Sequence, residues 1–407
     1  MAEPTFKDGL VLLTDRDFAR LFAAYLVTYL GTAMAPIAIA FGVLDLTGST
    51  RDSAIVIAAS TTGQILILLI GGTLADRTSR HRLLVFADVI AFCSQGAIAW
   101  LLMIGEATVM NLAGLMLITG VAYALHQPSI TGFIPQIVDR KKLQAANALL
   151  GVARNGAFTL GAALAGVLVA NIGAGPTLAL DALTFGLSGL LILSLRPKPQ
   201  ASTESATFFE DLRLGWREFI SHKWLWTIVL QFSLIVASLE AVFGLLGPAV
   251  SREYLGGAVS WGIIAAGFGA GTILGGLLAI RLRVERPMLF ASLLVLFWSI
   301  TPLLLSVPMA VPIVAMGAFV AGFTGQIFGV LWYTTLQTHV PSALLSRVSA
   351  YDHLGSVGIA PLGIIASGFL YESIGFRDTL YWCAALVVVP TLLVLCVREV
   401  REIRTVR

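Results

Sequence analysis

The strongest constraint on the fold of this chain is a succession of long apolar runs. A helix needs about twenty apolar residues to cross the hydrocarbon core of a bilayer. Twelve runs of that size follow one another along the 407 residues, near 18–44, 51–75, 83–104, 109–133, 145–171, 176–195, 224–250, 258–280, 287–306, 310–337, 347–371 and 376–397. We therefore expect an all-α membrane protein with twelve transmembrane helices.

Little of the chain is left for other structures. Only 12% of its residues are charged, whereas soluble domains carry roughly a quarter, and no long polar segment remains between the runs. The first run begins near Phe18 and is too long for a signal-peptide core, so we expect it to be retained as the first span. The three cysteines lie inside apolar runs and predict no disulfide framework.

Two segments half a chain apart resemble each other. Residues Gly71 to Leu84 read GGTLADRTSRHRLL, and residues Gly275 to Arg286, 204 positions later, read GGLLAIRLRVER. A second alignment, at an offset of 202, pairs glycines and apolar residues that include Gly161 and Gly363. Two alignments with nearly equal offsets indicate an internal duplication in parallel.

The duplication predicts two bundles of six helices each. Residues 1–195 are expected to form the first bundle, residues 196–223 a cytoplasmic linker, and residues 224–407 the second bundle. The linker opens with Pro197 and becomes periodic from Phe208, with its apolar residues on one helical stripe. We expect this part to be an amphipathic helix that lies along the inner membrane interface.

The basic residues predict the orientation, because lysine and arginine are retained on the cytoplasmic side during insertion. Of the 26 basic residues, 22 fall at loops on one side, and only Arg51, Arg252 and Arg377 fall on the other. Both termini are therefore expected to be cytoplasmic, and Arg154 is the one basic residue inside a span. Topology accounts for the basic loops, so no nucleic-acid surface is indicated.

The loop after the second run carries a signature. Its residues match or nearly match the pattern G-x-L-A-D-R-x-G-R-R at Gly72, Leu74, Ala75, Asp76, Arg77, Arg80 and Arg82. With twelve spans in two parallel halves, the whole chain resembles the major facilitator superfamily. Residues 336–350, LQTHVPSALLSRVSA, look like the loop into span 11 of its drug and siderophore exporter branch, which includes enterobactin and macrolide exporters. The resemblance implies a multi-pass transporter of the bacterial inner membrane and not an enzyme.

The chain departs from the family pattern at three positions. Ser79 stands where the signature has its second glycine, and His81 replaces the usual basic residue. Ala162 follows Gly161 in span 5, where proton-coupled exporters of the superfamily usually carry a proline. This last departure weakens the inference of proton antiport from the resemblance.

The resemblance also implies a cytoplasmic gate. Its candidate residues are Gly72, Asp76, Arg77, Arg80, Arg347 and Asp352. In the family the aspartate of the signature reaches the start of span 11, where free backbone N–H groups and the helix dipole favour an anion. The second half has Ile280 at the position equivalent to Asp76, so the latch is expected to be one-sided.

Ionisable residues inside spans are functional candidates, because each costs at least about 2.5 to 3.5 kcal/mol in hydrocarbon. Arg154 lies about ten residues into span 5, which is roughly 15 Å deep, and Glu240 about sixteen residues into span 7. Glu240 is our first candidate for the exchanged proton, Asp181 in span 6 is the weaker one, and His126 is a further one because histidine titrates near neutrality. Asp88, near the cytoplasmic end of span 3, is expected to act in gating or structural pairing. Structural neutralisation within a half is the alternative for Arg154, Glu240 and Asp181.

The resemblance implies that spans 1, 4, 7 and 10 line a central cavity. The substrate-cavity candidates on these spans are Tyr25, Tyr29, Tyr123, Gln127, Gln231, Phe232, Phe243, Gln326 and Phe328. Most of them are expected to serve in helix packing.

No nucleotide-binding loop, zinc motif or hydrolase elbow occurs in the sequence, so we expect no cofactor and a gradient as the energy source. The sequence predicts a monomeric secondary transporter that exports a small amphipathic organic molecule, of the drug or siderophore class, by alternating access with protons exchanged inward. The alternatives are an importer or facilitator of the same fold, a lysophospholipid flippase, and a non-transporting membrane scaffold or sensor.

Overall fold

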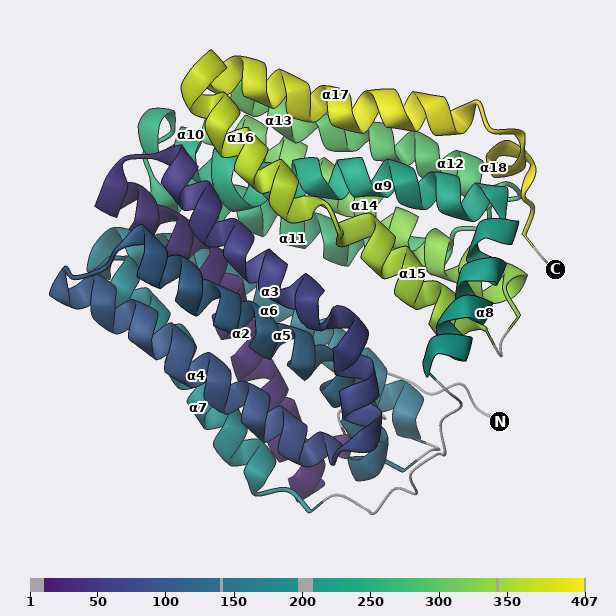
Figure 1. Cartoon of the computed structure of the whole chain (residues 1–407), viewed down its shortest axis with the longest axis horizontal. Coiled ribbons are helices and arrows are strands. Elements are labelled where there is room, and N and C mark those ends of the chain that lie inside the picture. The colour runs from purple at the N-terminus through teal and green to yellow at the C-terminus, as the bar shows by residue number, and fades with distance from the viewer. Residues whose placement is uncertain (1–10, 140–141, 197–207, 308, 342–343, 406–407) are drawn as a thin grey trace. The chain divides into compact units, whose positions relative to one another are not determined.

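The computed structural model describes residues 11–139, 142–196, 208–307, 309–341 and 344–405. Within these residues the side chains of 68–77, 128, 208–212 and 346 are not described. This part of the chain contains helices and no strand (Figure 1). The all-α class expected from the apolar runs is confirmed for these ranges.

The first half of the chain forms six long helices. They are α2 (Arg16–Thr47), α3 (Thr50–Arg77), α4 (Arg80–Ile104), α5 (Val109–Ile137), α6 (Leu143–Ile172) and α7 (Ala174–Leu193). Each of α2 to α6 contains one of the expected apolar runs, and α7 covers all but the last two residues of the run 176–195. At the start of α2, the Asp15 carboxylate accepts from the amides of Asp17 and Phe18, both at 3.0 Å, and caps the helix.

The second half is more broken. Its elements are α8 (Phe208–Ser221), α9 (Lys223–Ala241), the π-helix η2 (Val242–Leu246), α10 (Gly247–Tyr254), α11 (Ala258–Ala279), α12 (Pro287–Val295), the 3₁₀-helix η3 (Leu296–Ser299), α13 (Ile300–Ser306), α14 (Val311–His339), α15 (Leu345–Val357), α16 (Ala360–Ile374), α17 (Phe376–Leu395) and α18 (Arg398–Glu402). Three of the expected spans are thus runs of consecutive helices, namely α9 to α10, α12 to α13, and α15 to α16.

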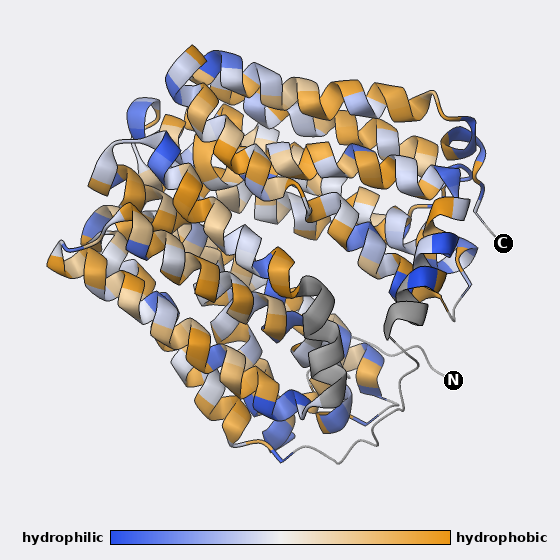
Figure 2. Cartoon of the chain, in the orientation of Figure 1, coloured by the Kyte–Doolittle hydropathy of each residue, from blue (hydrophilic) through white to orange (hydrophobic). Residues whose placement is uncertain are grey.

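Eleven helical segments among the described residues are long and apolar enough to cross a membrane. Apolar residues dominate along these helices, and polar residues gather near their ends (Figure 2). Helix α3 is not among the eleven, and it runs through the residues whose side chains are not described. The chain is a multi-pass membrane protein, and the twelfth crossing and the cytoplasmic termini stay predictions.

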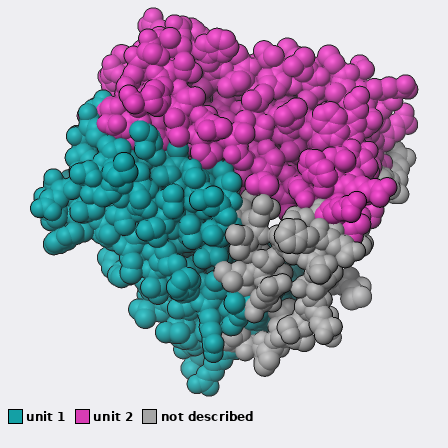
Figure 3. Space-filling model, in the orientation of Figure 1, with its two compact units in different colours: residues 1–48, 55–203 teal, residues 49–54, 204–407 magenta. Residues whose placement is uncertain are grey.

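The chain divides into two compact units (Figure 3). Unit 1 comprises Met1–Gly48 and Ile55–Thr203, and unit 2 comprises Ser49–Ala54 and Glu204–Arg407. The short segment at the start of α3 belongs to unit 2 because the Ser49 hydroxyl and the Arg51 amide donate to the Glu372 carboxylate, at 2.7 and 3.0 Å.

The internal repeat is visible in helix packing. In unit 1, a Cβ on Gly161 of α6 would lie 2.7 Å from the Ala33 Cβ of α2. In unit 2, a Cβ on Gly363 of α16 would lie 2.7 Å from the Ala237 Cβ of α9. The two glycines are 202 residues apart and the two alanines 204, so equivalent residues make equivalent contacts in each unit.

Glycines also bring backbones together within unit 2. A Cβ on Gly271 of α11 would collide with the backbone carbonyl of Phe319 in α14, and a Cβ on Gly322 of α14 would collide with that of Phe268 in α11. Dispersion contacts replace hydrophobic driving force between helices in lipid, so close approach through glycine is the main route to tight packing. Gly120 of α5 makes the same kind of contact with α3 in unit 1.

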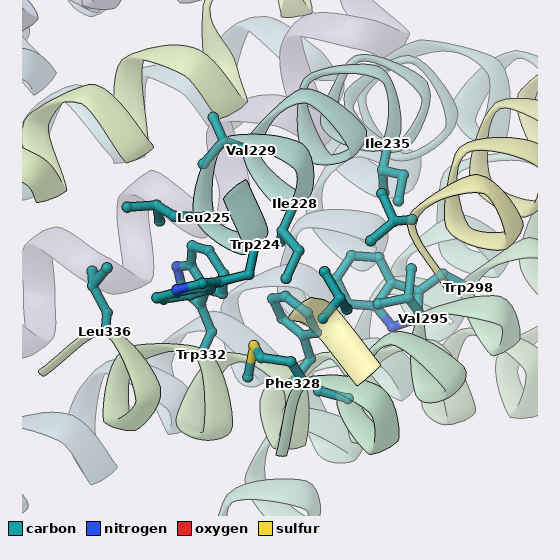
Figure 4. Close-up of a cluster of buried hydrophobic side chains, with 14 of the residues drawn as sticks. Trp224, Leu225, Ile228, Val229, Ile235, Val295, Trp298, Phe328, Trp332 and Leu336 are labelled. Atoms are coloured by element: carbon teal, nitrogen blue, oxygen red, sulfur yellow. The ribbon is translucent and has the colours of Figure 1, made fainter. Parts of the chain in front are cut away.

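Aromatic side chains fill the core of unit 2 (Figure 4). The Phe328 and Trp332 rings of α14 stack with their centroids 6.1 Å apart, and Trp224 of α9 meets Trp332 edge-on at 5.6 Å. Trp298 of η3 reaches Phe328 at 6.2 Å. This cluster holds α9 against α14 along much of their length.

The linker helix α8 uses part of its apolar stripe for packing. The Trp216 and Phe219 rings lie 5.3 and 6.0 Å from the Tyr351 ring of α15. Leu214 and Ile220 remain exposed. The exposed part of the stripe is available for the membrane interface, and that location stays a prediction.

We expect Gly271→Ala to destabilise the protein. A new Cβ must displace the α14 backbone, and overpacking of this kind costs about 1–3 kcal/mol. Gly329→Ala in α14 is the matched control, because a Cβ there meets no atom within 4 Å and alanine is the better helix former by about 1 kcal/mol. Thermal unfolding in detergent should show a lower midpoint for the first variant only; equal midpoints would contradict the close approach of α11 and α14.

Candidate functional site

A buried polar cluster of unit 1 joins three helices. Asp88 of α4 is 1% exposed, and its Oδ2 accepts from the Ser188 hydroxyl of α7 at 2.8 Å. Its other oxygen, Oδ1, lies 3.4 Å from His126 Nε2 of α5. Gly189 of α7 lies beside Asp88, because a Cβ there would be in ordinary van der Waals contact with the Asp88 Cβ at 3.4 Å. The sequence pointed to a pairing role for Asp88, and the structure supplies the partners.

A second carboxyl group is buried on α7, about two helical turns from Ser188. Asp181 is completely buried, and within the described part of the chain neither of its carboxyl oxygens has a hydrogen-bond partner. It lies against α2 at Gly31, where Oδ1 is 2.5 Å from the position that a Cβ would occupy. An unpaired carboxylate in such surroundings is costly, so the neutral acid is the form that fits.

Polar residues of α4 and α5 accompany this carboxyl group. The Gln95 amide donates to the Tyr123 hydroxyl over 3.2 Å, and Tyr123 is near enough to Asp181 to interact electrostatically with it. The Tyr123 ring also stacks on Phe185 of α7 at 5.7 Å. Tyr123, expected to line a cavity, thus lies between α4, α5 and α7.

A tyrosine pair and an amide form a second polar group in unit 1. The rings of Tyr25 and Tyr29, one turn apart on α2, have centroids 4.4 Å apart. The Gln127 amide of α5 donates to the Tyr29 hydroxyl over 3.0 Å. Arg154 of α6 is exposed and interacts electrostatically with Tyr25. This tyrosine–arginine cluster, Tyr25, Tyr29, Gln127 and Arg154, unites three cavity candidates with the intramembrane cation; a carboxylate partner for Arg154 stays a prediction.

Two cavity candidates of unit 2 are core residues instead. Gln231 is 2% exposed, and its amide donates to the Thr391 hydroxyl of α17 at 2.8 Å. Phe328 is buried in the aromatic cluster. Both residues point toward neighbouring helices of their own unit, because the rotation of α9 and α14 about their axes was not predictable from position along the span.

The remaining candidates of unit 2 are only half-buried. Phe232 stacks on Phe328 with centroids 4.5 Å apart. Phe243, in the π-helix, lies 4.9 Å from Phe268 of α11, centroid to centroid. Gln326 lies beside Gly276, whose missing side chain leaves room for it. These three residues keep part of their surface free for a ligand.

Glu240 differs from the expectation. Its side chain keeps an exposed surface, although protein atoms surround much of it, so burial alone does not rank it as a proton carrier. It lies in the last turn of α9, directly before the π-helix η2. Helical irregularities of this kind are frequent at functional sites, and Glu240 therefore stays a candidate, behind Asp181.

The described gating candidates make contacts within their own unit. Arg80 donates to the Gly132 carbonyl of α5 over 2.9 Å. In unit 2, Asp352 is buried and accepts from the Trp332 indole N–H at 3.0 Å, while Arg347 lies beside Gly215 of α8. The side chains of the signature residues Gly72, Asp76 and Arg77 lie outside the described ones.

His81 explains one departure from the family pattern. Its Nε2 lies 2.8 Å from the Ile192 carbonyl oxygen of α7, and its ring stacks on Phe133 of α5 at 5.6 Å. A flat ring of this size joins the ends of α4, α5 and α7. The residue therefore has a packing role that the sequence pattern did not suggest.

The arrangement of helices is similar to that of solved membrane transporters. The solved structure of the nucleoside transporter NupG superposes with a TM-score of 0.75 at 14% identity, covering 93% of this chain and 98% of that one. The structure of a bacterial homologue of the human lysosomal transporter Spinster, inward-facing and unoccupied, superposes with a TM-score of 0.75 at 14% identity. The match covers 95% of this chain and 98% of that one. The likeness shows that the chain shares the helical fold of these two membrane proteins.

The family follows from the sequence match. The model of the transmembrane secretion effector family, MFS_3, matches residues 9–405, so the chain belongs to this family of the major facilitator superfamily. The multidrug efflux pump Tap of Mycolicibacterium fortuitum is 26% identical, over 88% of this chain and 90% of that protein. The enterobactin exporter EntS of Citrobacter koseri is 24% identical, over 97% of this chain and 95% of that protein. The resemblance to the drug and siderophore exporters is thereby confirmed.

We expect Trp332→Phe to destabilise unit 2, because it removes the N–H donor from a buried carboxylate, at a cost of about 1–3 kcal/mol. The exposed Trp382 provides the control variant Trp382→Phe. The double variant with Asp352→Asn should lose less stability than the sum of the losses in the two single variants, since the residues share one interaction. Full additivity of the thermal midpoints would show that the hydrogen bond contributes nothing.

Proposed function

We propose that this protein is a secondary exporter of a small amphipathic organic molecule of the drug or siderophore class, driven by proton antiport through alternating access. The observation that carries the proposal is Asp181, a fully buried carboxyl group without a hydrogen-bond partner in the described part of an apolar helix bundle. The efflux and exporter relatives support the outward direction.

Proton exchange follows from the surroundings of Asp181. A carboxyl group that is neutral while buried must release its proton whenever water or a cation reaches it, and take one up again when the site closes. Ionisable residues inside spans commonly serve as proton carriers in transporters. Asp181 is therefore the first proton-coupling residue in this proposal, with His126 and Glu240 behind it.

The tyrosine–arginine cluster is the proposed substrate surface of unit 1. Tyrosine rings offer apolar faces together with hydroxyl groups, and an exposed arginine offers a fixed cation that pairs with carboxylate or phenolate groups. Phe232, Phe243 and Gln326 are the corresponding surface in unit 2. Such a mixture of aromatic, amide and charged groups suits an amphipathic molecule better than a small inorganic ion.

The remaining features of the proposal come from topology. The protein is a monomer in the bacterial inner membrane with both termini cytoplasmic, and its halves, 1–195 and 224–407, open the substrate site alternately to the two sides. No cofactor takes part, and the proton gradient supplies the energy.

We expect Asp181→Asn to abolish pH-driven transport, because the amide can neither bind nor release the proton. In proteoliposomes with an imposed pH gradient, ethidium transport should fall by at least about tenfold, which is a barrier change of about 1.4 kcal/mol. Energy-independent ethidium exchange should persist. The exposed Asp378→Asn is the matched control.

Two other outcomes would change the assignment. If Asp181→Asn transports ethidium at the wild-type rate, Glu240 becomes the proposed proton carrier. The variant Glu240→Gln then tests that assignment. Substrate and proton moving in the same direction would make the protein an importer.

Asp76→Asn should weaken the proposed cytoplasmic latch. Loss of about 1.4 kcal/mol would shift the equilibrium tenfold toward the inward-facing state, so a cysteine placed at Gln127 in a cysteine-free background should react faster with an impermeant maleimide from the cytoplasm. Ile280→Ala, at the repeat-equivalent position, should change labelling much less. Unchanged labelling in Asp76→Asn would reduce Asp76 to a folding or topology residue.

A further inference from the structure

We propose that Asp88, His126 and Ser188 form a second proton-binding site inside unit 1, separate from Asp181. The inference rests on the proposed function for its role in transport, but not for its chemistry. Asp88 comes from α4, His126 from α5 and Ser188 from α7, and all three residues are buried. We call this set the α4–α5–α7 proton site.

Charge counting gives the proton content of the site. With no proton bound, Asp88 and His126 carry one negative charge between them; with two, they carry one positive charge. Only the state with a single shared proton is neutral, and neutrality is strongly favoured where water is absent. His126 Nε2 lies 3.4 Å from Asp88 Oδ1, and Oδ1 has no hydrogen-bond partner among the described residues, so this oxygen is available for the shared proton.

Ser188 completes the site. Its hydroxyl donates to Asp88 Oδ2, which leaves Oδ1 as the oxygen that takes the proton. The apolar residues Leu83, Ala87 and Leu125 form a buried cluster on the same stretch of α4 and α5. The site is thus polar at one point and apolar around it, as expected where a single proton decides the charge.

The neighbouring ionisable groups are engaged elsewhere. On α4, Arg80 donates to the Gly132 carbonyl and His81 contacts the Ile192 carbonyl, while Arg82 is exposed. On α5, Tyr123 is bonded to Gln95. On α7, Asp181 lies seven residues from Ser188, about 10 Å along the helix. No lysine or arginine forms a recorded salt bridge with Asp88 within the described residues, so His126 is its charge partner.

The spacing places two proton sites in one group of helices. Gln95 and Tyr123, which accompany Asp181, lie seven residues from Asp88 on α4 and three from His126 on α5. The two sites therefore occupy successive layers between the same three helices, about two helical turns apart on α4 and α7 and about one turn apart on α5. A movement of α5 relative to α4 and α7 would change both sites together, and this is how they would be coupled to the transport cycle.

Infrared titration of the purified protein in nanodiscs tests the site without any substrate. Wild-type protein should show protonated-carboxyl bands, one of which disappears in Asp88→Asn while any band from Asp181 remains. In Ser188→Ala, which retains the carboxyl group, the band should remain but move toward the frequency of a carboxyl without a donor. In His126→Gln its titration midpoint should shift by at least about one pH unit, a tenfold change in proton affinity. Ser94→Ala is the matched control, since Ser94 is buried on α4 and bonded to Thr119 of α5 but touches no ionisable group.

The outcomes separate the site from the proposed function. If the band is unchanged in both Asp88→Asn and Ser188→Ala, the site does not exist, whatever the transport assays show. If the wild-type protein moves no protons during ethidium transport, the proposed antiport fails, and the infrared titration still decides whether Asp88 holds a proton. Loss of proton coupling in Asp88→Asn, with ethidium exchange retained, is the result expected when both hold.

Discussion

Hydrocarbon offers no hydrogen-bond partner to a peptide group, and the structure of this protein follows from that constraint. Every apolar run must close its backbone bonds internally, so the chain becomes helices. Because lipid tails solvate apolar side chains as well as protein does, helices gain little from hydrophobic contact and must instead approach closely. Gly161 and Gly363 provide that approach at equivalent places in the two units, and Gly271 and Gly322 provide it between α11 and α14.

The same constraint divides the buried polar side chains into two kinds. The Gln231 amide N–H donates to the Thr391 hydroxyl, and the Trp332 indole N–H donates to Asp352, each across a helix contact. Such pairs fix the rotation of one helix against the next. Asp181 and the Oδ1 oxygen of Asp88 are not satisfied in this way among the described groups. Burying such a group costs free energy, so a protein that retains one usually has a use for it. Both groups lie in unit 1, and the proposed proton-coupling residues are placed there for that reason.

The exporter relatives are similar at low identity but over nearly the whole chain. Identity at that level preserves the helix framework while side chains that contact a substrate diverge. His81 departs from the family pattern but makes packing contacts of its own, since its ring contacts both Ile192 and Phe133. The tyrosine–arginine cluster and Asp181 are therefore better guides to this protein's chemistry than the names of its relatives.

The sequence alone determined the helices, the duplication and the superfamily, because each depends on local composition or on spacing along the chain. It also identified Asp181, Asp88 and His126 as unusual, since an ionisable residue inside an apolar run is visible without any fold. Tertiary structure decided which of these residues meet. Asp88 and Ser188 are 100 positions apart, and helical periodicity gives depth along a span but not the rotation of a helix or the identity of its neighbour. For that reason Gln231 and Phe328 proved to be core residues and Glu240 proved to be exposed. These outcomes depend on how whole helices pack, and the position of a residue along its own span does not determine them.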